Sequence, residues 1–220
     1  MDMITSSEKA YRRIQQAIVE GEFPRGEFLS QRMLAELAGT SIISAREALK
    51  RLEYEGFLES VPRWGVRIPH DSRESIIERY ALREAIEVMV AYLLSRAIEP
   101  RRAEELKKRA DECDAICSDS ADGVSRFAEE HRQLHLYMAE CTGNQLLKEE
   151  LERLGLRTLL YQSAKTTWAR KVDNWERWHR SLIDEILTGD PARAQEAMHR
   201  HIQHGLYHDL QMFDQGLFDV

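Results

Sequence analysis

The sequence of 220 residues has no run of roughly 18 uncharged apolar residues, the length that a helix needs to span a bilayer. Its beginning, MDMITSSEKAYRRIQQ, also lacks the basic region and the apolar run of a secretion signal. We therefore expect no membrane association and a cytoplasmic location.

Cysteine is scarce, because the chain has only three: Cys113, Cys117 and Cys141. An odd number of cysteines in a chain of this length disfavours a disulfide framework. We expect reduced thiols that pack as ordinary helix residues.

Signatures of common enzymes are also missing. No glycine-rich phosphate loop, no Ser-His-Asp order and no pair of carboxylates suited to acid–base catalysis stands out beside the histidines. Glu129 and Glu130 precede His131 but are expected to point elsewhere on the helix. The segment HRQLH has Arg132 where a zinc protease of the HExxH type has its general base. A metal-dependent enzyme is therefore the weakest of the functions considered below.

An overall basic charge is absent too, since the formal net charge is −7. The charge is unevenly distributed, because residues 1–70 carry ten Lys/Arg and ten Asp/Glu and the deficit falls on residues 71–220. Six of the cations lie close together in the sequence: Arg32, Arg46, Lys50, Arg51, Arg63 and Arg67. A basic face for nucleic acid is possible without a basic composition.

What the first 70 residues do contain is a series of short elements. Apolar residues at helical spacing predict a first helix over 11–18, and a turn follows over 22–28. Ser30 and Ser41 are suitable N-caps for helices over 31–38 and 42–54. Two short strands, 57–61 and 65–68, follow around a loop. This order predicts a winged helix-turn-helix.

From about residue 73 onward the pattern is helical with few breaks. Pro100, the segment Thr142-Gly143-Asn144 and the segment Gly189-Asp190-Pro191 mark helix ends and starts. Six helices are predicted, over 73–97, 100–118, 122–141, 144–169, 172–188 and 191–213. The fold is therefore expected to be mainly α, with a winged domain over 1–70 and an all-α antiparallel bundle over 71–220.

These segments resemble a known family. FPRGEFLSQRMLAELAG, SIISAREALKRLEYEGFL and PRWGVRI resemble the DNA-binding domain of GntR-type transcription regulators. CTGNQLL and ILTGDPARAQEAMHRHI resemble the FCD ligand-binding domain of the FadR-type branch. Six bundle helices are more similar to the VanR-type subset of that branch.

The resemblance implies which residues contact DNA, each with a physical reason. Arg46 can hold the two major-groove acceptors of guanine, and Ser41 can donate to a phosphate at a helix N-terminus. The family usually has Arg, Thr and Pro after the capping serine, where this chain has Ile42, Ile43 and Ser44. An isoleucine can contact a thymine methyl. The implied DNA-binding residues are Arg32, Ser41, Ile42, Arg46 and Gly65.

His131 and His135 are four positions apart on a predicted helix, so both could bind one cation. On spacing alone, surface or core histidines are the commoner interpretation. The resemblance adds His179 and His201, because the metal variant of the FCD domain has ligands at matching positions. His131 then takes a position usually held by Asp, or it stands beside a three-histidine site as a non-ligand.

An imidazole in place of a carboxylate gives an all-nitrogen ligand set. Such a set favours zinc, nickel, copper or cobalt over magnesium or manganese. We therefore predict a divalent transition metal as cofactor. His199, His204 and His208 have no matching role and are expected to be solvated.

Arg83 resembles an inward arginine of the family and could bind a carboxylate effector in a bidentate way. An ion pair with Glu87, one helical turn further on, is an equally good interpretation. Trp175 and Trp178 either line the effector pocket or belong to the core.

The expected function is a metabolite-responsive transcription regulator, most often a repressor. It would bind a palindromic double-stranded DNA operator as a homodimer and take a small organic acid as effector. A sensor of the metal ion itself is the alternative, and a metal-dependent enzyme is a more distant one.

Overall fold

The computed structural model describes residues 4–19, 22–23, 26–116, 121–154 and 177–216. The described residues fall into two compact units, one up to Asp71 and the other from Ser72 onward. Each unit is considered by itself.

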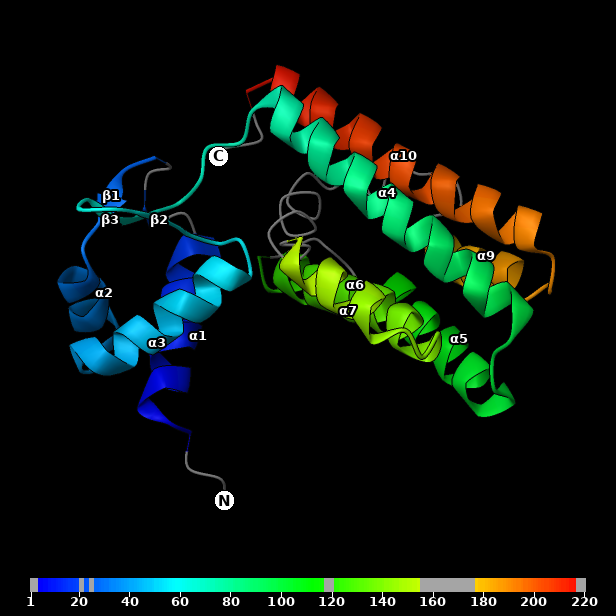
Figure 1. The fold of residues 1–220 in the computed structure, drawn as a ribbon, viewed down its shortest axis with the longest axis horizontal. Coiled ribbons are helices and arrows are strands. Elements are labelled where there is room, and N and C mark those ends of the chain that lie inside the picture. Colours follow the sequence, from blue (N-terminus) through cyan, green and yellow to red (C-terminus); the bar gives the residue numbers. More distant parts are fainter. Residues whose placement is uncertain (1–3, 20–21, 24–25, 117–120, 155–176, 217–220) are drawn as a thin grey trace. The chain divides into compact units, whose positions relative to one another are not determined.

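The first unit contains the three predicted helices, α1 (Ser6–Val19), α2 (Gln31–Ala38) and α3 (Ile42–Tyr54) (Figure 1). Ser30 accepts a hydrogen bond from the amide of Met33, so it caps α2, and Gly39 ends that helix in the left-handed conformation at φ 58°. Ser41 accepts from the amide of Ser44 and caps α3. The predicted caps are therefore confirmed, and α1 begins earlier than its apolar periodicity indicated.

A three-stranded antiparallel sheet completes this unit, with strand order β1-β3-β2. The strands are β1 (Phe28–Leu29), β2 (Glu59–Val61) and β3 (Gly65–Arg67). Val66 of β3 is paired with Leu29 on one side and Ser60 on the other. The prediction of a plain turn over 22–28 was wrong at its last residue, because Phe28 begins β1.

The core of the first unit joins all of these elements. It is formed by Ala10, Tyr11, Ile14, Leu29, Leu34, Ala38, Ala48, Leu49, Leu52, Phe57, Leu58, Val66 and Ile68. Met33 of α2 is apolar but exposed, and it lies outside this core. The wing and the three helices therefore share one hydrophobic core.

The second unit is all helical in the part that the structure describes. Its helices are α4 (Arg73–Arg96), α5 (Pro100–Asp114), α6 (Ala121–Cys141), α7 (Gln145–Arg153), α9 (Trp178–Ile186) and α10 (Pro191–Asp214). The predicted fold class is thus confirmed. The predicted helices over 144–169 and 172–188 lie partly outside the described residues, and α5 ends at Asp114 rather than at 118.

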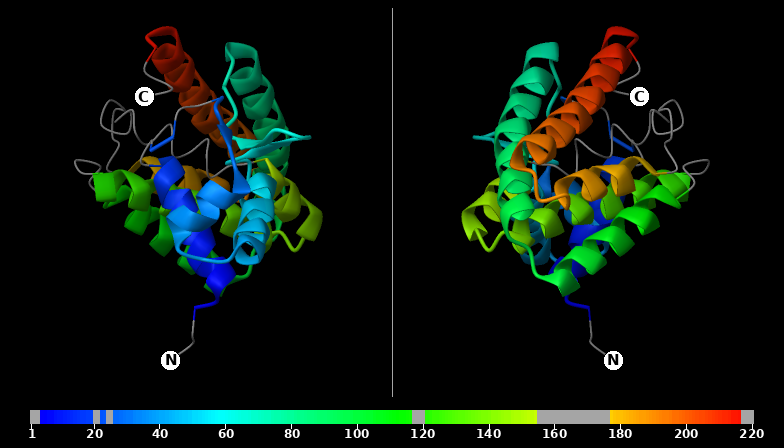
Figure 2. Two further views of the ribbon diagram at one scale, coloured as in Figure 1. Left: turned by 90° about the vertical axis from the view of Figure 1, so that its left-hand side faces the viewer. Right: turned by 90° about the vertical axis from the view of Figure 1, so that its right-hand side faces the viewer.

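The long helices α4 and α10 run antiparallel, side by side (Figures 1 and 2). Their pairing is fixed by polar contacts along their length, from Arg73 with Asp214 at one end to Glu84 with His199 further along. Between these contacts, the Tyr80 hydroxyl donates to the buried Asp209 carboxylate over 2.8 Å. Gly205 faces Tyr80, and a Cβ there would lie 3.1 Å from the hydroxyl oxygen.

The core of the second unit lies among these helices and includes Ile76, Val90, Leu94, Leu106, Leu134, Met138, Ile183, Ile186, Met198 and Ile202. Cys113 and Cys141 are buried free thiols, as predicted, and Cys117 lies outside the described residues. No helix among the described residues is long and apolar enough to cross a membrane.

Candidate metal centre and DNA-reading surface

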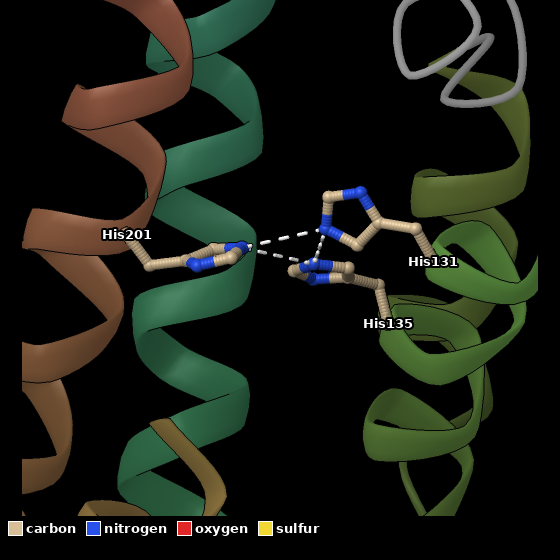
Figure 3. Close-up of side chains that lie close together, drawn as sticks. All are labelled: His131, His135 and His201. Carbon is tan, nitrogen blue, oxygen red and sulfur yellow. Dashed lines mark hydrogen bonds between the residues drawn. The ribbon is translucent and has the colours of Figure 1, made fainter. Parts of the chain in front are cut away.

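Three histidines of the second unit converge on one point. His131 and His135 lie on α6 and His201 on α10, and all three side chains are buried. The Nε2 atoms of His131 and His135 are 2.9 Å apart, and His201 Nε2 lies 3.3 Å from that of His135 and 3.5 Å from that of His131. Figure 3 shows the three rings directed toward one another.

These separations fit a shared metal ion. Two nitrogens at about 2.0–2.1 Å from one zinc ion are roughly 2.9 Å apart at a right angle and roughly 3.4 Å apart at the tetrahedral angle. The three Nε2 atoms cover this range, so they can form one face of a coordination shell. Three nitrogen lone pairs at such distances repel one another unless protons or a cation lie between them.

A buried carboxylate fixes the tautomer of His135. Its Nδ1 donates a hydrogen bond to Glu87 Oε2, and Arg83 Nε donates to Glu87 Oε1 over 2.6 Å. Burial raises the pKa of Glu87, but His135 and Arg83 outweigh this effect and bring that pKa to about 2. Glu87 is therefore ionised, and the lone pair of His135 is on Nε2, the atom that faces the cluster.

His179 approaches the same cluster from α9. Its ring centroid is 4.4 Å from that of His131 and 5.4 Å from that of His201. Its Nδ1 donates to Asp114 Oδ1 over 2.6 Å, which leaves Nε2 as the nitrogen for a ligand. That Nε2 is buried and has no hydrogen-bond partner among the described residues.

Asp114 also positions α9 as a whole. The last residue of α5, it accepts from the backbone amide of His179 over 3.0 Å and from that of Arg180 over 2.9 Å. Arg177, the residue at the N-cap of α9, makes no capping hydrogen bond with its own side chain. Asp114 therefore caps α9 from another helix and orients His179 with the same carboxylate.

The cluster contains neutral imidazoles. Burial lowers the pKa of His131 and of His201 well below the ordinary value, and the neighbouring histidines lower both further. Burial also lowers the pKa of His135, although Glu87 opposes it. Neutral imidazole is the form that binds a metal ion, so these ligands need lose no proton near neutral pH.

The surroundings correct one expectation. Trp178 stacks near His201 and His204, with centroids 5.7 and 4.9 Å away. His204 is half-buried, and burial followed by His208 lowers its pKa, so it is not the solvated residue that was predicted. His199 is partly exposed and contacts Glu84. Trp175 lies outside the described residues.

Arg83 forms the ion pair that one interpretation of the sequence expected, and it also reaches the cluster near which the other interpretation placed an effector. Its side chain is buried and forms the ion pair with Glu87. Its Nη2 also lies 3.4 Å from His135 Nε2, which brings the guanidinium to the edge of the histidine cluster. Burial opposes the charge of Arg83, but Glu87 outweighs that cost and raises the pKa of the guanidinium.

The residues expected to meet DNA lie on the surface of the first unit. Arg32 is exposed and pairs with Glu36 over 3.1 Å. Arg46 is also exposed, on the outward face of α3, and its Nε lies 3.3 Å from Gln31 Oε1. Ser41 is exposed and caps α3. These weak surface contacts leave the guanidinium groups free to exchange partners.

The backbone geometry requires glycine at position 65, in addition to the role in DNA binding that was expected for Gly65. It has φ 106°, and a Cβ there would lie 2.8 Å from the carbonyl oxygen of Leu29 on the neighbouring strand β1. Only glycine fits this backbone without strain. Arg63 at the tip of the same hairpin is the one non-glycine residue with positive φ, at 73°, in the part of the chain that the structure describes.

Sequence reasoning missed Asp114 and the orienting role of Glu87. Glu87 was considered only as a partner of Arg83, one turn away. Asp114 meets His179 across 65 residues of chain, and no local pattern marks such a pair.

A winged helix-turn-helix joined to an all-helical unit with an internal polar cluster defines a DNA-binding regulator. Residues 6–68 match the model of bacterial regulatory proteins of the gntR family, and residues 78–204 match that of the FCD domain. The chain belongs to the gntR family of bacterial regulatory proteins, in the group with an FCD domain. It is a transcriptional regulator and not an enzyme.

Relatives in sequence and in structure agree with this assignment. The chain is 25% identical to a probable D-xylose utilization operon transcriptional repressor of Paenarthrobacter nicotinovorans, over 84% of this chain and 80% of that protein. It is 24% identical to the transcriptional repressor GlaR of Escherichia coli, over 91% and 94%. The fold is similar to that of E. coli McbR/YncC, with a TM-score of 0.70, 18% identity and coverage of 97% and 100%.

Proposed function

We propose that this chain is a metabolite-responsive repressor that binds a palindromic operator as a homodimer. Residues 1–70 would bind DNA, and residues 71–220 would bind the effector and form the dimer. The match to the gntR family supports the DNA-binding part. Two relatives that are named as repressors support the direction of control. A symmetric dimer reads symmetric half-sites, so an effector need only change the spacing or freedom of two winged units.

The metal part of the proposal depends on one observation, the convergence of three buried Nε2 atoms within 3.5 Å of one another. His131, His135 and His201 would hold a divalent transition metal, with His179 as a fourth ligand. The all-nitrogen set favours zinc, nickel, copper or cobalt. These residues would hold the ion, which would supply positive charge and, where it takes more than four ligands, positions for an anion.

Arg83 would take part in effector binding through a change of partner. Its Nη2 faces the lone pair of His135 Nε2 over 3.4 Å, while its Nε stays with Glu87. A single lone pair serves one partner, so Nη2 is released when His135 acts as a ligand. Nη2 is then available to a small carboxylate at the open positions, where a guanidinium donates well.

A metal assay tests the site. Purified wild type is compared with the His135→Ala and His179→Ala variants. His199→Ala serves as a surface control, because the partly exposed His199 pairs with Glu84 and lies outside the cluster. Wild type and the control are expected to retain metal, and both cluster variants to lose most of it. Unchanged metal content in the cluster variants would remove the site from the proposal.

The proposed DNA contacts are Arg32, Ser41, Ile42, Arg46 and Gly65. A duplex enriched from a random-sequence pool supplies the probe. Arg46→Ala is expected to lower affinity for this duplex far more than for unrelated DNA, since a bidentate contact to guanine contributes about 1–3 kcal/mol of discrimination. Arg200→Ala, an exposed arginine of α10, is the control. Equal losses on both kinds of DNA would contradict base reading by Arg46.

A sensor of the metal ion itself is the second candidate, and the convergence of three histidine ligands, His131, His135 and His201, is the observation that favours it. Titration with metal and with organic acids separates the metal sensor from the acid-responsive repressor. If metal stays bound through purification and an organic acid alone releases the duplex, the effector is the acid. A screen of melting temperature against small organic acids finds the ligand, because binding to the folded form raises the melting temperature. Release of DNA by metal alone would favour the sensor.

A further inference from the structure

We propose that Ile42 and Ile43 at the start of α3 read thymine methyl groups, so that Ile43 is a specificity-determining residue beside Arg46. This inference rests on the proposed function, because it assumes that α3 enters the major groove. It adds a residue and a kind of base contact that the arginine by itself does not provide.

The two isoleucines are unusually exposed for branched apolar side chains. Ile42 is 46% exposed and Ile43 is 73% exposed, whereas Ala45, Ala48, Leu49 and Leu52 of the same helix are buried. The helix therefore has a complete apolar face toward the core, and the isoleucines are not part of it. Their exposure costs solubility, and neither side chain belongs to the buried core of the first unit.

Cations lie on the same side of α3 as the two isoleucines, and they indicate that the partner of this surface carries negative charge. Arg46 lies three positions after Ile43 and four after Ile42, so its side chain is a neighbour of each isoleucine on the helix surface. Arg46 and Lys50 are exposed, and neither forms an ion pair with another residue that the structure describes. An apolar patch next to unpaired cations fits the major groove, where phosphates flank the base edges.

The base edge that matches isoleucine is thymine. Its C5 methyl is the apolar group that the major groove presents, and small aliphatic side chains contact it in protein–DNA complexes. Ile42 and Ile43 have no polar atom beyond the backbone, so they cannot accept or donate to any other base edge. The pair therefore favours thymine by burial and excludes cytosine, whose amino group would lose its hydrogen bond to water.

Helix geometry places the thymines relative to the guanine read by Arg46. Three to four residues correspond to about 5–6 Å along the helix axis, and successive base pairs are about 3.4 Å apart. The methyl groups are therefore expected one or two base pairs from that guanine. This is a prediction for the half-site sequence.

Removal of single methyl groups from the DNA tests the inference. The enriched duplex is synthesised with each thymine replaced in turn by deoxyuridine, which keeps every hydrogen-bonding group. Wild type is expected to lose affinity about four-fold at one or two positions, the effect of one methyl group. Ile43→Ala is expected to bind the thymine and deoxyuridine duplexes equally at one of these positions.

Ile77→Ala, an exposed isoleucine of α4, is the matched control and should discriminate like wild type. The inference is overturned if wild type ignores every methyl group, or if Ile43→Ala still distinguishes thymine from deoxyuridine. A change in oligomeric state with unchanged discrimination would instead assign the isoleucines to a protein contact. If no duplex is enriched at all, it is the proposed function that fails.

Discussion

The imidazoles of His135 and His179 are each backed by a buried carboxylate, Glu87 and Asp114. A carboxylate that accepts from Nδ1 holds the ring in the tautomer with its lone pair on Nε2 and makes that nitrogen more basic. His131 and His201 have no hydrogen-bond partner at Nδ1 among the described residues. The cluster therefore has two ligands with fixed tautomers and two whose tautomer a bound ion would select.

Glu87→Gln should weaken metal binding about 10- to 100-fold, because an amide is a poorer acceptor for His135 and leaves Arg83 without its anionic partner. Competition with a chromophoric chelator measures the affinity. Glu84→Gln, on the same helix but bonded to His199, is the control and should bind metal like wild type. Equal affinities for wild type and Glu87→Gln would show that the carboxylate does not tune the site.

Individual elements are held in place by contacts that cross between helices and strands. Asp114 caps α9 from the end of α5, and β1 fits against β3 because Gly65 has no Cβ. Both contacts place a candidate functional residue, His179 in one case and the wing tip in the other. The contacts that hold these helices and strands in place thus also position the candidate functional residues.

Asp114→Ala should remove the cap of α9 and destabilise the second unit by about 0.5–2 kcal/mol. It should also lower metal affinity, because His179 loses its orienting acceptor. Asp111→Ala, one turn earlier and paired with Arg180 at the surface, should show neither effect. Denaturant unfolding measures the stability of both variants, and metal competition measures their metal affinity. A loss of stability without any change in metal affinity would limit Asp114 to capping.

Gly65→Ala should destabilise the first unit by about 1–3 kcal/mol, since a side chain at φ 106° is strained and its Cβ would meet the Leu29 carbonyl. Gly143→Ala provides the comparison, because Gly143 has φ 73° but nothing within 4 Å of the added Cβ. The loss of stability is measured by hydrogen exchange of the β1–β3 amides. Similar costs at both glycines would attribute the loss to backbone conformation alone.

The sequence patterns predicted well those features that depend only on residues close together in the chain, such as helix caps. Ser30 and Ser41 were identified as caps because an N-cap needs only a hydroxyl and the amides that follow it. Strand β1 was missed because two residues have no periodicity, and their partners in β3, Arg67 and Val66, lie 39 and 37 positions later in the chain. The His131–His135 pair was visible as spacing, but its contact with His201 could be predicted only through the family resemblance, since α6 and α10 are far apart in the sequence.

At the scale of the whole molecule, metal and DNA are assigned to different units of one chain. The Nε2 cluster lies in the second unit, and the exposed arginines of α2 and α3 lie in the first. A ligand that binds only the folded form stabilises the unit that contains its site. The two units should therefore respond differently to metal.

A chelator should lower the melting temperature of the second unit and leave that of the first unchanged. At a free metal concentration 100 times the dissociation constant, bound metal contributes about 2.7 kcal/mol of stability. Calorimetry of wild type with and without chelator measures the change, and His135→Ala should not respond to the chelator at all. An identical response of that variant would mean that the metal is held elsewhere.

Helix α4 is continuous from Arg73 to Arg96, and its capping box of Ser72 and Ser75 lies at the boundary between the units. Glu87 is 14 residues from the start of this helix, a distance of about 20 Å along a stiff rod. The helix that carries Glu87 to the imidazole cluster is therefore also the first element after the boundary between the units, and its hydrogen-bonded backbone runs without a break between these two points.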